Sequence, residues 1–439
     1  MARTADLAVD SPDTTAADVG DGDVTLSLAR RADRFPDRTA IVDISEEELY
    51  APARTIDERR VSYAALSELA TATAERLATL EVGSGDTVCL LTRNRVASFV
   101  LFFACRRLGA TLAPISHLLT PVTVQRPFEH IAPALVVSEA AQRDLVRSIP
   151  VDQSLTLEEL AAVDPADDVE LETGPVTSDG PRLVCHGERG RPLVAYGERT
   201  LEHNCLTAVV AWGLGRGDVV PLIGPLSSFH SLLRGGLPAL YVGGRLLLDR
   251  AFDPGDALTA IATHGATFVA GRPMAYRDLA ADPGADALAS LERAVVEGPM
   301  PEDVAAAFFE RGVSVMRAYG RLECPTAFSR AVDVGPDTVA VSDHDCVGRP
   351  VPDCRARLVA DGTVLEGAGE GRLELAGPVV ADGYVDDVDG DLDEDERSES
   401  DTRANEQSNG TANRGQFRGE WFDSRTRFRR DDDDVYHAR

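Results

Sequence analysis

LVCHGERGRPLVAYG, residues 183–197, is the stretch on which the interpretation of the fold rests. It begins with the apolar end of a strand, and two glycines three residues apart are followed by an Arg-Pro pair. Gly187 and Gly190 allow backbone N–H groups to curl around an anion, as in a phosphate-binding turn. The hydroxyl groups and the lysine that such a turn usually offers are missing. The pattern predicts either a weak anion-binding loop, with Arg189 and Arg191 as its cations, or a surface turn.

The length and composition predict a cytoplasmic protein of two or three subdomains. A chain of 439 residues is too long for one ordinary core. No run of about 18 apolar residues occurs, and the N-terminus has no apolar segment of the secretory type, so we expect neither a membrane span nor secretion. The seven cysteines are odd in number and have no CxxC spacing, which is typical of reduced thiols.

The charge is strongly negative, with a net value of −29 and with 44 basic residues that are all arginines. The resulting self-repulsion is mostly screened at molar salt, where the Debye length falls to about 3 Å. We therefore interpret the chain as a halophilic protein, because an acidic protein from a low-salt environment explains the complete absence of lysine less well. No net basic face is expected, so nucleic-acid binding is disfavoured.

Strand and helix patterns alternate from residue 25 to 345 and predict a layered α/β fold, with mostly parallel sheets flanked by helices. Residues 62–80, for example, have apolar side chains at helical spacing behind a serine cap. Residues 97–110 form a second apolar helix pattern, which a glycine ends.

The rest of the chain divides by composition. Short, alternating, glycine-rich segments at 346–384 predict a small antiparallel β subdomain that is completed by residues 419–439. Acidic and polar stretches predict a disordered tail at 1–24 and a disordered loop at 385–418.

Several segments, in this order, resemble the large N-terminal domain of the adenylate-forming superfamily. This superfamily contains the AMP-forming acyl-CoA synthetases and other AMP-dependent synthetases and ligases. The resemblance covers residues 25–439. The segments that carry it are the phosphate loop at 183–197, a Pro-Leu-x-x-x-His segment at 224–248, a shortened adenine-contact loop at 295–308, a Tyr-Gly-x-Thr-Glu motif at 318–325 and a Gly-Trp-x-x-Thr-Gly-Asp run at 420–428.

The resemblance implies a reaction in two steps. The carboxylate of a small acid attacks the α-phosphate of ATP, giving an acyl-adenylate and pyrophosphate, and a thiol, usually that of CoA, then displaces AMP. Both steps build negative charge, so the site must supply donors and cations. ATP or AMP, Mg²⁺ and CoA are therefore the expected ligands, although the departures described below leave their retention open.

The resemblance also assigns roles to residues. Tyr319 would stack on adenine, Glu323 would hold Mg²⁺ as a hard oxygen ligand, and His230 would line the acyl side. The full set of expected nucleotide-binding residues is Gly187, Arg189, Gly190, Arg191, Gly298, Pro299, Tyr319, Gly320, Glu323 and Arg439. A purely structural role stays open for Tyr319 and Glu323 as turn residues and for His230 as a packed histidine.

The sequence departs from the family pattern where charge is needed. In the phosphate loop, Glu188 stands at a hydroxyl position and Leu193 at the lysine position. A carboxylate about 4 Å from a phosphate charge costs about 4 kcal/mol at an effective dielectric of about 20. Leu322 replaces the threonine of the Tyr-Gly motif, and residues 424–426 carry no carboxylate at the ribose position.

Three interpretations follow. The family continues beyond the position of Arg439 with a small lysine-bearing domain, which we expect to be absent here. The chain is then a ligase homologue with impaired or lost catalysis, a ligase that works with a separate C-terminal domain, or a nucleotide-binding or scaffold protein that partners a true ligase. The fold-shaping glycines and prolines persist while the charged chemistry does not, which favours the first interpretation. Fold alone does not establish activity.

Overall fold

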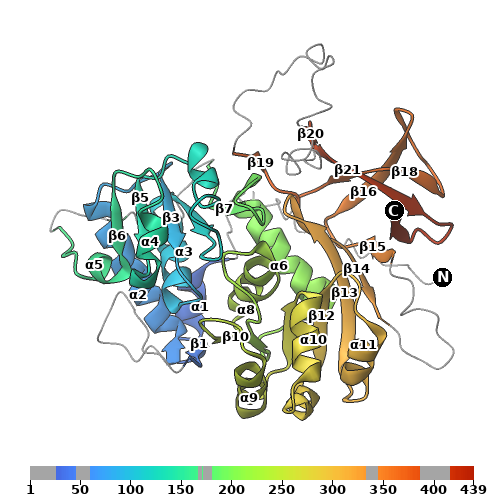
Figure 1. Cartoon of the computed structure of the whole chain (residues 1–439), viewed down its shortest axis with the longest axis horizontal. Coiled ribbons are helices and arrows are strands. Elements are labelled where there is room, and N and C mark those ends of the chain that lie inside the picture. The colour runs from blue at the N-terminus through green and yellow to red at the C-terminus, as the bar shows by residue number, and fades with distance from the viewer. Residues whose placement is uncertain (1–25, 46–59, 167–170, 172–179, 333–344, 386–415) are drawn as a thin grey trace, which may run out of the picture.

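The computed structural model describes residues 26–45, 60–166, 171, 180–332, 345–385 and 416–439. Helices flank mostly parallel sheets in the larger part of the molecule, and antiparallel strands form the smaller part (Figure 1). This arrangement confirms the layered α/β fold with a small antiparallel region. None of the described helices is long and apolar enough to cross a membrane. The disorder expected at 1–24 and at 386–415 falls outside the described residues.

A seven-stranded sheet carries the phosphate loop near one edge. Its strands, in spatial order, are β19 (Gly383–Tyr384), β8 (Leu193–Tyr196), β7 (Leu183–His186), β4 (Thr111–Ile115), β3 (Thr87–Leu91), β5 (Leu135–Ser138) and β6 (Ser154–Thr156). The strands from β7 to β6 pair in parallel, whereas β8 and β19 pair antiparallel at the edge. Continuous apolar runs such as TVCLL in β3 suit a parallel sheet, because both of its faces are covered.

Two helices begin and end close to where the sequence predicts. α2 (Tyr63–Thr79) begins behind Ser62, whose Oγ accepts the N–H of Ala65 at 3.1 Å. α3 (Val96–Leu108) ends at Gly109, which has a left-handed φ of 71°. Both helices bury their apolar faces in the largest core cluster.

Two further sheets complete the fold. The smaller has the order β2 (Arg60–Ser62), β1 (Thr39–Asp43), β10 (Arg245–Leu248) and β9 (Val219–Pro221). The larger begins with the parallel strands β11 (Phe268–Gly271), β12 (Arg293–Glu297) and β13 (Ser314–Arg321). It continues with antiparallel strands β14 (Cys324–Ala331), β15 (Cys346–Pro350), β22 (Tyr436–Ala438), β21 (Trp421–Arg430), β18 (Gly369–Ala376), β16 (Arg355–Ala360) and β17 (Thr363–Val364), with β20 (Gln416–Arg418) paired to β21.

The other described helices pack around these sheets. They are α1 (Leu28–Arg34), α4 (Arg143–Val146), α5 (Leu157–Ala161), α6 (Glu198–Trp212), α7 (Phe229–Ser231), α8 (Leu237–Val242), α9 (Pro254–His264), α10 (Pro273–Ala281) and α11 (Glu302–Phe309). Short 3-10 turns lie at η1 (Arg126–Glu129), η2 (Ala140–Gln142) and η4 (Ala285–Ser290). A π-helical turn, η3 (Leu232–Gly236), joins α7 to α8.

One boundary differs from the sequence expectation. Residues 416–418, placed in the disordered loop, form β20, because Phe417 packs its ring against Phe422 at 4.9 Å and against Tyr384 at 5.2 Å. Sequence reasoning missed this strand because the acidic residues before Phe417 are typical of a disordered loop. The antiparallel strands and the parallel strands belong to one continuous sheet, since β15 pairs with β14 on one side and with β22 on the other. The expected subdomain division at residue 346 stays a prediction.

A buried carboxylate fastens the loop that follows β3. Glu139, which is 4 % exposed, contacts Arg93 at 2.8 Å and Arg95 at 2.5 Å. Burial by itself raises the pKa of Glu139, but the hydrogen bonds from the two arginines outweigh it and hold the pKa at about 2. Asn94, between these arginines, accepts the N–H of Leu226 at 2.7 Å. The network therefore ties the seven-stranded sheet to the segment before α7.

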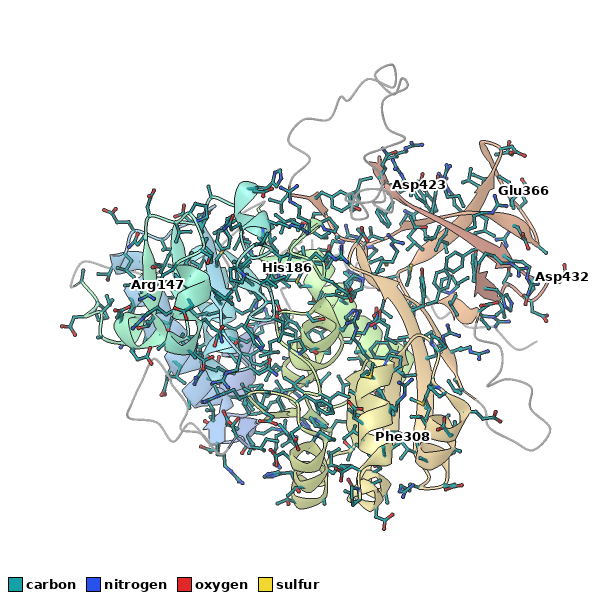
Figure 2. All side chains as sticks on the ribbon, viewed as in Figure 1. Arg147, His186, Phe308, Glu366, Asp423 and Asp432 are labelled. Atoms are coloured by element: carbon teal, nitrogen blue, oxygen red, sulfur yellow. The ribbon has the colours of Figure 1, made fainter. Side chains whose placement is uncertain are left out.

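We expect Glu139→Gln to lower the free energy of unfolding by about 3 kcal/mol, because it leaves the buried Arg95 and the partly buried Arg93 without their anion. The folded pKa of Glu139 lies below its ordinary value of 4.5, so its stabilisation is complete above pH 4.5 and is lost as the pH falls toward 2. Denaturant unfolding at several pH values measures both effects. Glu366→Gln, an exposed change on the antiparallel sheet (Figure 2), is the matched control. Equal losses in the two variants would contradict the assignment.

Candidate functional site

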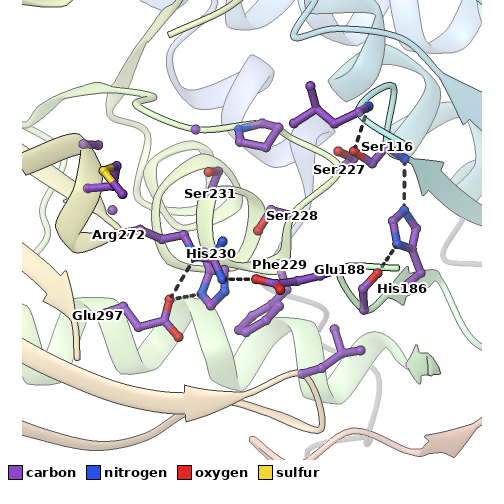
Figure 3. A pocket seen from close by; sticks show the side chains of 18 of the residues that line it. Ser116, His186, Glu188, Ser227, Ser228, Phe229, His230, Ser231, Arg272 and Glu297 are labelled. Atoms are coloured by element: carbon purple, nitrogen blue, oxygen red, sulfur yellow. Dashed lines mark hydrogen bonds and ion pairs between the residues drawn. The ribbon is translucent and has the colours of Figure 1, made fainter. Parts of the chain in front are cut away.

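A cavity of about 1080 Å³ opens where parallel strands of all three sheets end. Part of its lining comes from residues at or just after the carboxyl ends of β4, β7, β9, β11, β12 and β13, and residues of α7 and α10 supply another part. Ligands of open α/β sheets bind outside the carboxyl ends of the strands, so this position is the one expected of a substrate site. In Figure 3, side chains from several of these segments converge on one space.

The structure brings part of the predicted site together at this cavity. The predicted residues that line it are Gly187, Arg189, Arg191, His230, Gly320 and Glu323. Those outside the lining are Gly190, Gly298, Pro299, Tyr319 and Arg439. The phosphate loop, the acyl-side histidine and the Tyr-Gly turn therefore meet in space, whereas the adenine-contact pair and the final arginine do not face the cavity.

The phosphate loop is a tight turn between β7 and β8. Gly187 donates its N–H to the carbonyl of Pro192, and Gly190 donates to the carbonyl of Gly187, both at 2.9 Å. A Cβ at Gly187 would clash with the loop backbone, and Gly190 has a φ of 85°, so both positions require glycine. His186 accepts the N–H of Ser116 at 3.0 Å. Burial lowers the pKa of His186, so its neutral ring fastens the loop to the end of β4.

The two arginines of the phosphate loop, Arg189 and Arg191, line the cavity but differ in their contacts. Arg191 contacts Glu129 and His130, so its charge is shared with a carboxylate before any ligand binds. Arg189 is exposed. Leu193, at the family's lysine position, is fully buried in β8 and offers no polar group to the cavity.

Glu188 supplies a negative charge on the same loop. Its carboxylate lies 2.7 Å from Nη2 of Arg272, the residue before α10, and its side chain is 80 % exposed. The pair crosses from the phosphate loop to the opposite side of the cavity (Figure 3). A phosphate approaching the loop would therefore meet a carboxylate where the family offers a hydroxyl group.

A cluster of one carboxylate, one histidine and two arginines forms another side of the cavity. Oε2 of Glu297 lies 2.5 Å from Nδ1 of His230, 3.4 Å from Nη1 of Arg234 and 4.0 Å from Nε of Arg272. Figure 3 shows His230 and Arg272 directed at Glu297. Arg234, which is buried, also donates to the carbonyl of Pro325 from both Nε and Nη2.

The charge state of this cluster follows from its burial. Burial lowers the pKa of His230 to about 4 despite the contact with Glu297, so the ring is neutral at pH 7. Burial opposes the ionisation of Glu297, but Arg234, His230 and Arg272 outweigh it and hold its pKa at about 2. The cavity therefore contains a neutral imidazole held between a carboxylate and a buried guanidinium.

The Tyr-Gly turn packs closely against other parts of the chain. The ring of Tyr319 packs against Phe428 at 5.4 Å and Phe328 at 6.1 Å, within the sheet. Glu323 lines the cavity but is only 3 % exposed. Its Oε1 accepts the hydroxyl of Tyr384 at 2.5 Å, and its Oε2 lies 3.4 Å from Nε of Arg321.

The segment aligned with the ribose-binding run lies in the antiparallel region. Ser424 is fully buried, and Asp423 is paired with Arg372 at 2.9 Å. Figure 2 shows Asp423 away from His186. Arg439 pairs with Glu370 at 2.7 Å. None of these described residues lines the cavity.

Sequence reasoning missed the cavity residues Arg272, Glu297 and Arg321 and the buried Arg234. A weak signal existed for Arg272, which directly follows an apolar strand pattern, and for Glu297, which stands at the end of one. Arg321 stands inside the Tyr-Gly motif at its variable position. Arg234 lies in an apolar helix pattern, where a buried arginine requires partners that local sequence does not reveal.

The fold is that of the N-terminal domain of adenylate-forming enzymes. The family model described as AMP-binding enzyme matches residues 28–385. The chain therefore belongs to the AMP-binding enzyme family, and the resemblance predicted from its motifs is confirmed.

Relatives and solved structures agree with this assignment. The chain is 28% identical over 369 residues to feruloyl-CoA synthase of an Amycolatopsis species, covering 75% of this chain and 72% of the relative. O-succinylbenzoate coenzyme A synthetase of Bacillus subtilis, solved with ATP and magnesium ion, has a TM-score of 0.73 at 18% identity over 94% of this chain and 78% of its own. The N-terminal domain of FACL13 from Mycobacterium tuberculosis has a TM-score of 0.74 at 18% identity, over 95% and 99% of the two chains.

The family's magnesium ion does not fit the residues that are present. Both oxygens of Glu323 are engaged, one by a tyrosine hydroxyl and the other by the guanidinium of Arg321. Mg²⁺ beside nucleotide phosphates usually takes only one or two protein carboxylates, so the fit rests on Glu323. The guanidinium of Arg321 beside this carboxylate repels a cation there.

We expect Arg234→Met to lower the free energy of unfolding by about 3 kcal/mol, because Glu297 and the Pro325 carbonyl lose their donor in a buried setting. The double variant Arg234→Met/Glu297→Gln should recover about half of this loss, since the unpaired charge is then removed. Denaturant unfolding of the two variants measures the difference. A double variant that is no more stable than the single one would show that Glu297 is not the partner that matters.

Proposed function

We propose that this protein is an acyl-CoA synthetase-like ligase homologue that binds ATP or AMP and a small carboxylic acid in the cavity, but forms the acyl-adenylate poorly or not at all by itself. The observation that carries the proposal is the Glu188 carboxylate on the phosphate loop, paired with Arg272 across the cavity. The reaction class follows from the family and from the names of relatives such as feruloyl-CoA synthase.

The electrostatics support reduced catalysis. Adenylate formation and thiol attack both require cations and donors aimed at developing negative charge. Here the loop adds a carboxylate, Leu193 is buried at the lysine position, and Leu322 stands at the threonine position. The 439 residues contain no lysine. Any lysine-dependent step therefore needs a group from outside these residues, and we propose a separate C-terminal domain or a ligase partner as its source.

The cavity itself supports retained binding. A volume of about 1080 Å³ accommodates an acyl group together with part of a nucleotide, since small-molecule sites measure about 300–1,000 Å³. Phe229, Phe252 and Ile223 line it and suit an apolar acyl group. CoA is the thiol acceptor by analogy with the relatives, and no group in the described cavity argues for it specifically.

A second candidate is a non-enzymatic role, in which a partner covers the cavity. Leu118 and Met274 line the cavity but are 71 % and 61 % exposed, which is unusual for large apolar side chains. In this candidate the chain is a nucleotide-binding or scaffold protein for a true ligase.

Calorimetric titration of ATP into the full chain, in multimolar KCl, separates the two candidates. We expect the wild type to bind more weakly than about 100 μM and to catalyse no measurable ATP–pyrophosphate exchange with carboxylic acids. Glu188→Thr should bind ATP about fivefold more tightly, because an exposed charge interaction is worth up to about 1 kcal/mol.

Glu310→Gln, an exposed change outside the cavity lining, is the control and should bind as the wild type does. Absence of heat at millimolar ATP in every variant would remove the nucleotide-binding proposal and leave the scaffold. Pyrophosphate exchange by the wild-type chain alone would contradict the impairment.

A further inference from the structure

The turn between β13 and β14 places a cation and a carboxylate at the cavity in a fixed geometry. Arg321 pairs with Cys324 across the hairpin, so Leu322 and Glu323 form its turn. The carbonyl of Leu322 accepts the hydroxyl of Tyr196, and the carbonyl of Glu323 accepts the N–H of Ala381 at 2.8 Å. The backbone of the turn is therefore held from both sides by other parts of the chain.

Within this turn, the Glu323 carboxylate is already neutralised. Besides the hydroxyl of Tyr384, its nearest polar partner is Nε of Arg321, at 3.4 Å. The side chain of Arg321 is 20 % exposed and lines the cavity, and it also bonds the hydroxyl of Tyr319. Arg321 thus occupies the oxygen of Glu323 that a metal ion would need, and its side chain lines the cavity.

The arginines and carboxylates of the lining are equal in number. The lining contains four arginines and four carboxylates, namely Arg189, Arg191, Arg272 and Arg321, and Glu188, Asp278, Glu297 and Glu323. Burial lowers the pKa of both lining histidines, so they add no charge at pH 7. A divalent cation placed beside Glu323 would lie against the guanidinium of Arg321 and be repelled by it.

We propose that Arg321 takes the place of the divalent cation, so that the cavity binds the polyphosphate of a nucleotide as the metal-free anion. A guanidinium carries its charge at every pH of interest and presents a planar fork of donors that matches phosphate oxygens. Tyr384 and Arg321 hold Glu323 as a buried counter-ion that orients the guanidinium rather than as a metal ligand. The inference rests on the proposed nucleotide binding.

The test compares ATP binding with and without metal, by calorimetry on the full chain in multimolar KCl. One series contains excess EDTA, and the other contains magnesium chloride in excess of ATP. In each series the additive has the same concentration in the cell and in the syringe. We expect the two dissociation constants of the wild type to agree within about twofold. Arg321→Met should weaken metal-free ATP binding about tenfold, which is the loss expected for one charged hydrogen-bonding group. Mg²⁺ should restore part of the lost affinity in this variant, because Glu323 no longer has the guanidinium beside it.

Arg147→Met is the matched control, because Arg147 is an exposed arginine on the far side of the seven-stranded sheet from the antiparallel region (Figure 2). It should change neither series. Wild-type binding that is tenfold or more tighter with Mg²⁺ would overturn the inference and leave the proposed nucleotide binding in place. Absence of heat in both series would overturn both. The wild-type comparison decides the question even where the Arg321 variant does not fold.

Discussion

The buried guanidinium of Arg234 is the constraint on which the cavity depends. An arginine removed from water must have its charge and donors satisfied by the protein, so its partners are not free to move. These partners are the carbonyl of Pro325 in β14 and the carboxylate of Glu297 at the end of β12. Arg234 itself stands in the π-helical turn between α7 and α8, and such turns are frequent at functional sites. One side chain thereby fixes three elements relative to each other, and His230 is held between them.

The same logic extends to the rest of the site, where arginines are paired by carboxylates of the chain itself. Arg272 contacts Glu188 and Glu297, and Arg321 contacts Glu323. A lysine ammonium would serve less well here, because a guanidinium contacts two oxygens in a fixed plane and is less strongly hydrated. The arginine-only composition and the internally neutralised cavity are thus consistent with each other. An incoming anion would therefore share these arginines with carboxylates of the protein.

The sequence predicted what depends on local pattern. The Ser62 cap, the glycine at 109 and the alternation of strands and helices along the chain each have a signal within a few residues, and the structure confirms them. The pairings of the candidate site have no such signal, because Arg272 and Glu188 are 84 residues apart in the chain. The ring of Tyr319, expected to face adenine, packs in a sheet for the same reason: its aromatic neighbour Phe428 comes from a distant strand.

The edge of the seven-stranded sheet has a consequence for how the chain is assembled. β8, which follows the phosphate loop, is paired on its outer side by β19, whose residues Gly383 and Tyr384 come almost two hundred positions later. During synthesis from the N-terminus, β8 therefore emerges long before its neighbour and presents an unpaired edge in the interval. Such a late, non-local pairing is slow to form because the intervening chain must first be ordered. Tyr384 also donates to Glu323, so the same strand that closes this edge completes one side of the cavity. The cavity is therefore completed only after most of the chain has left the ribosome.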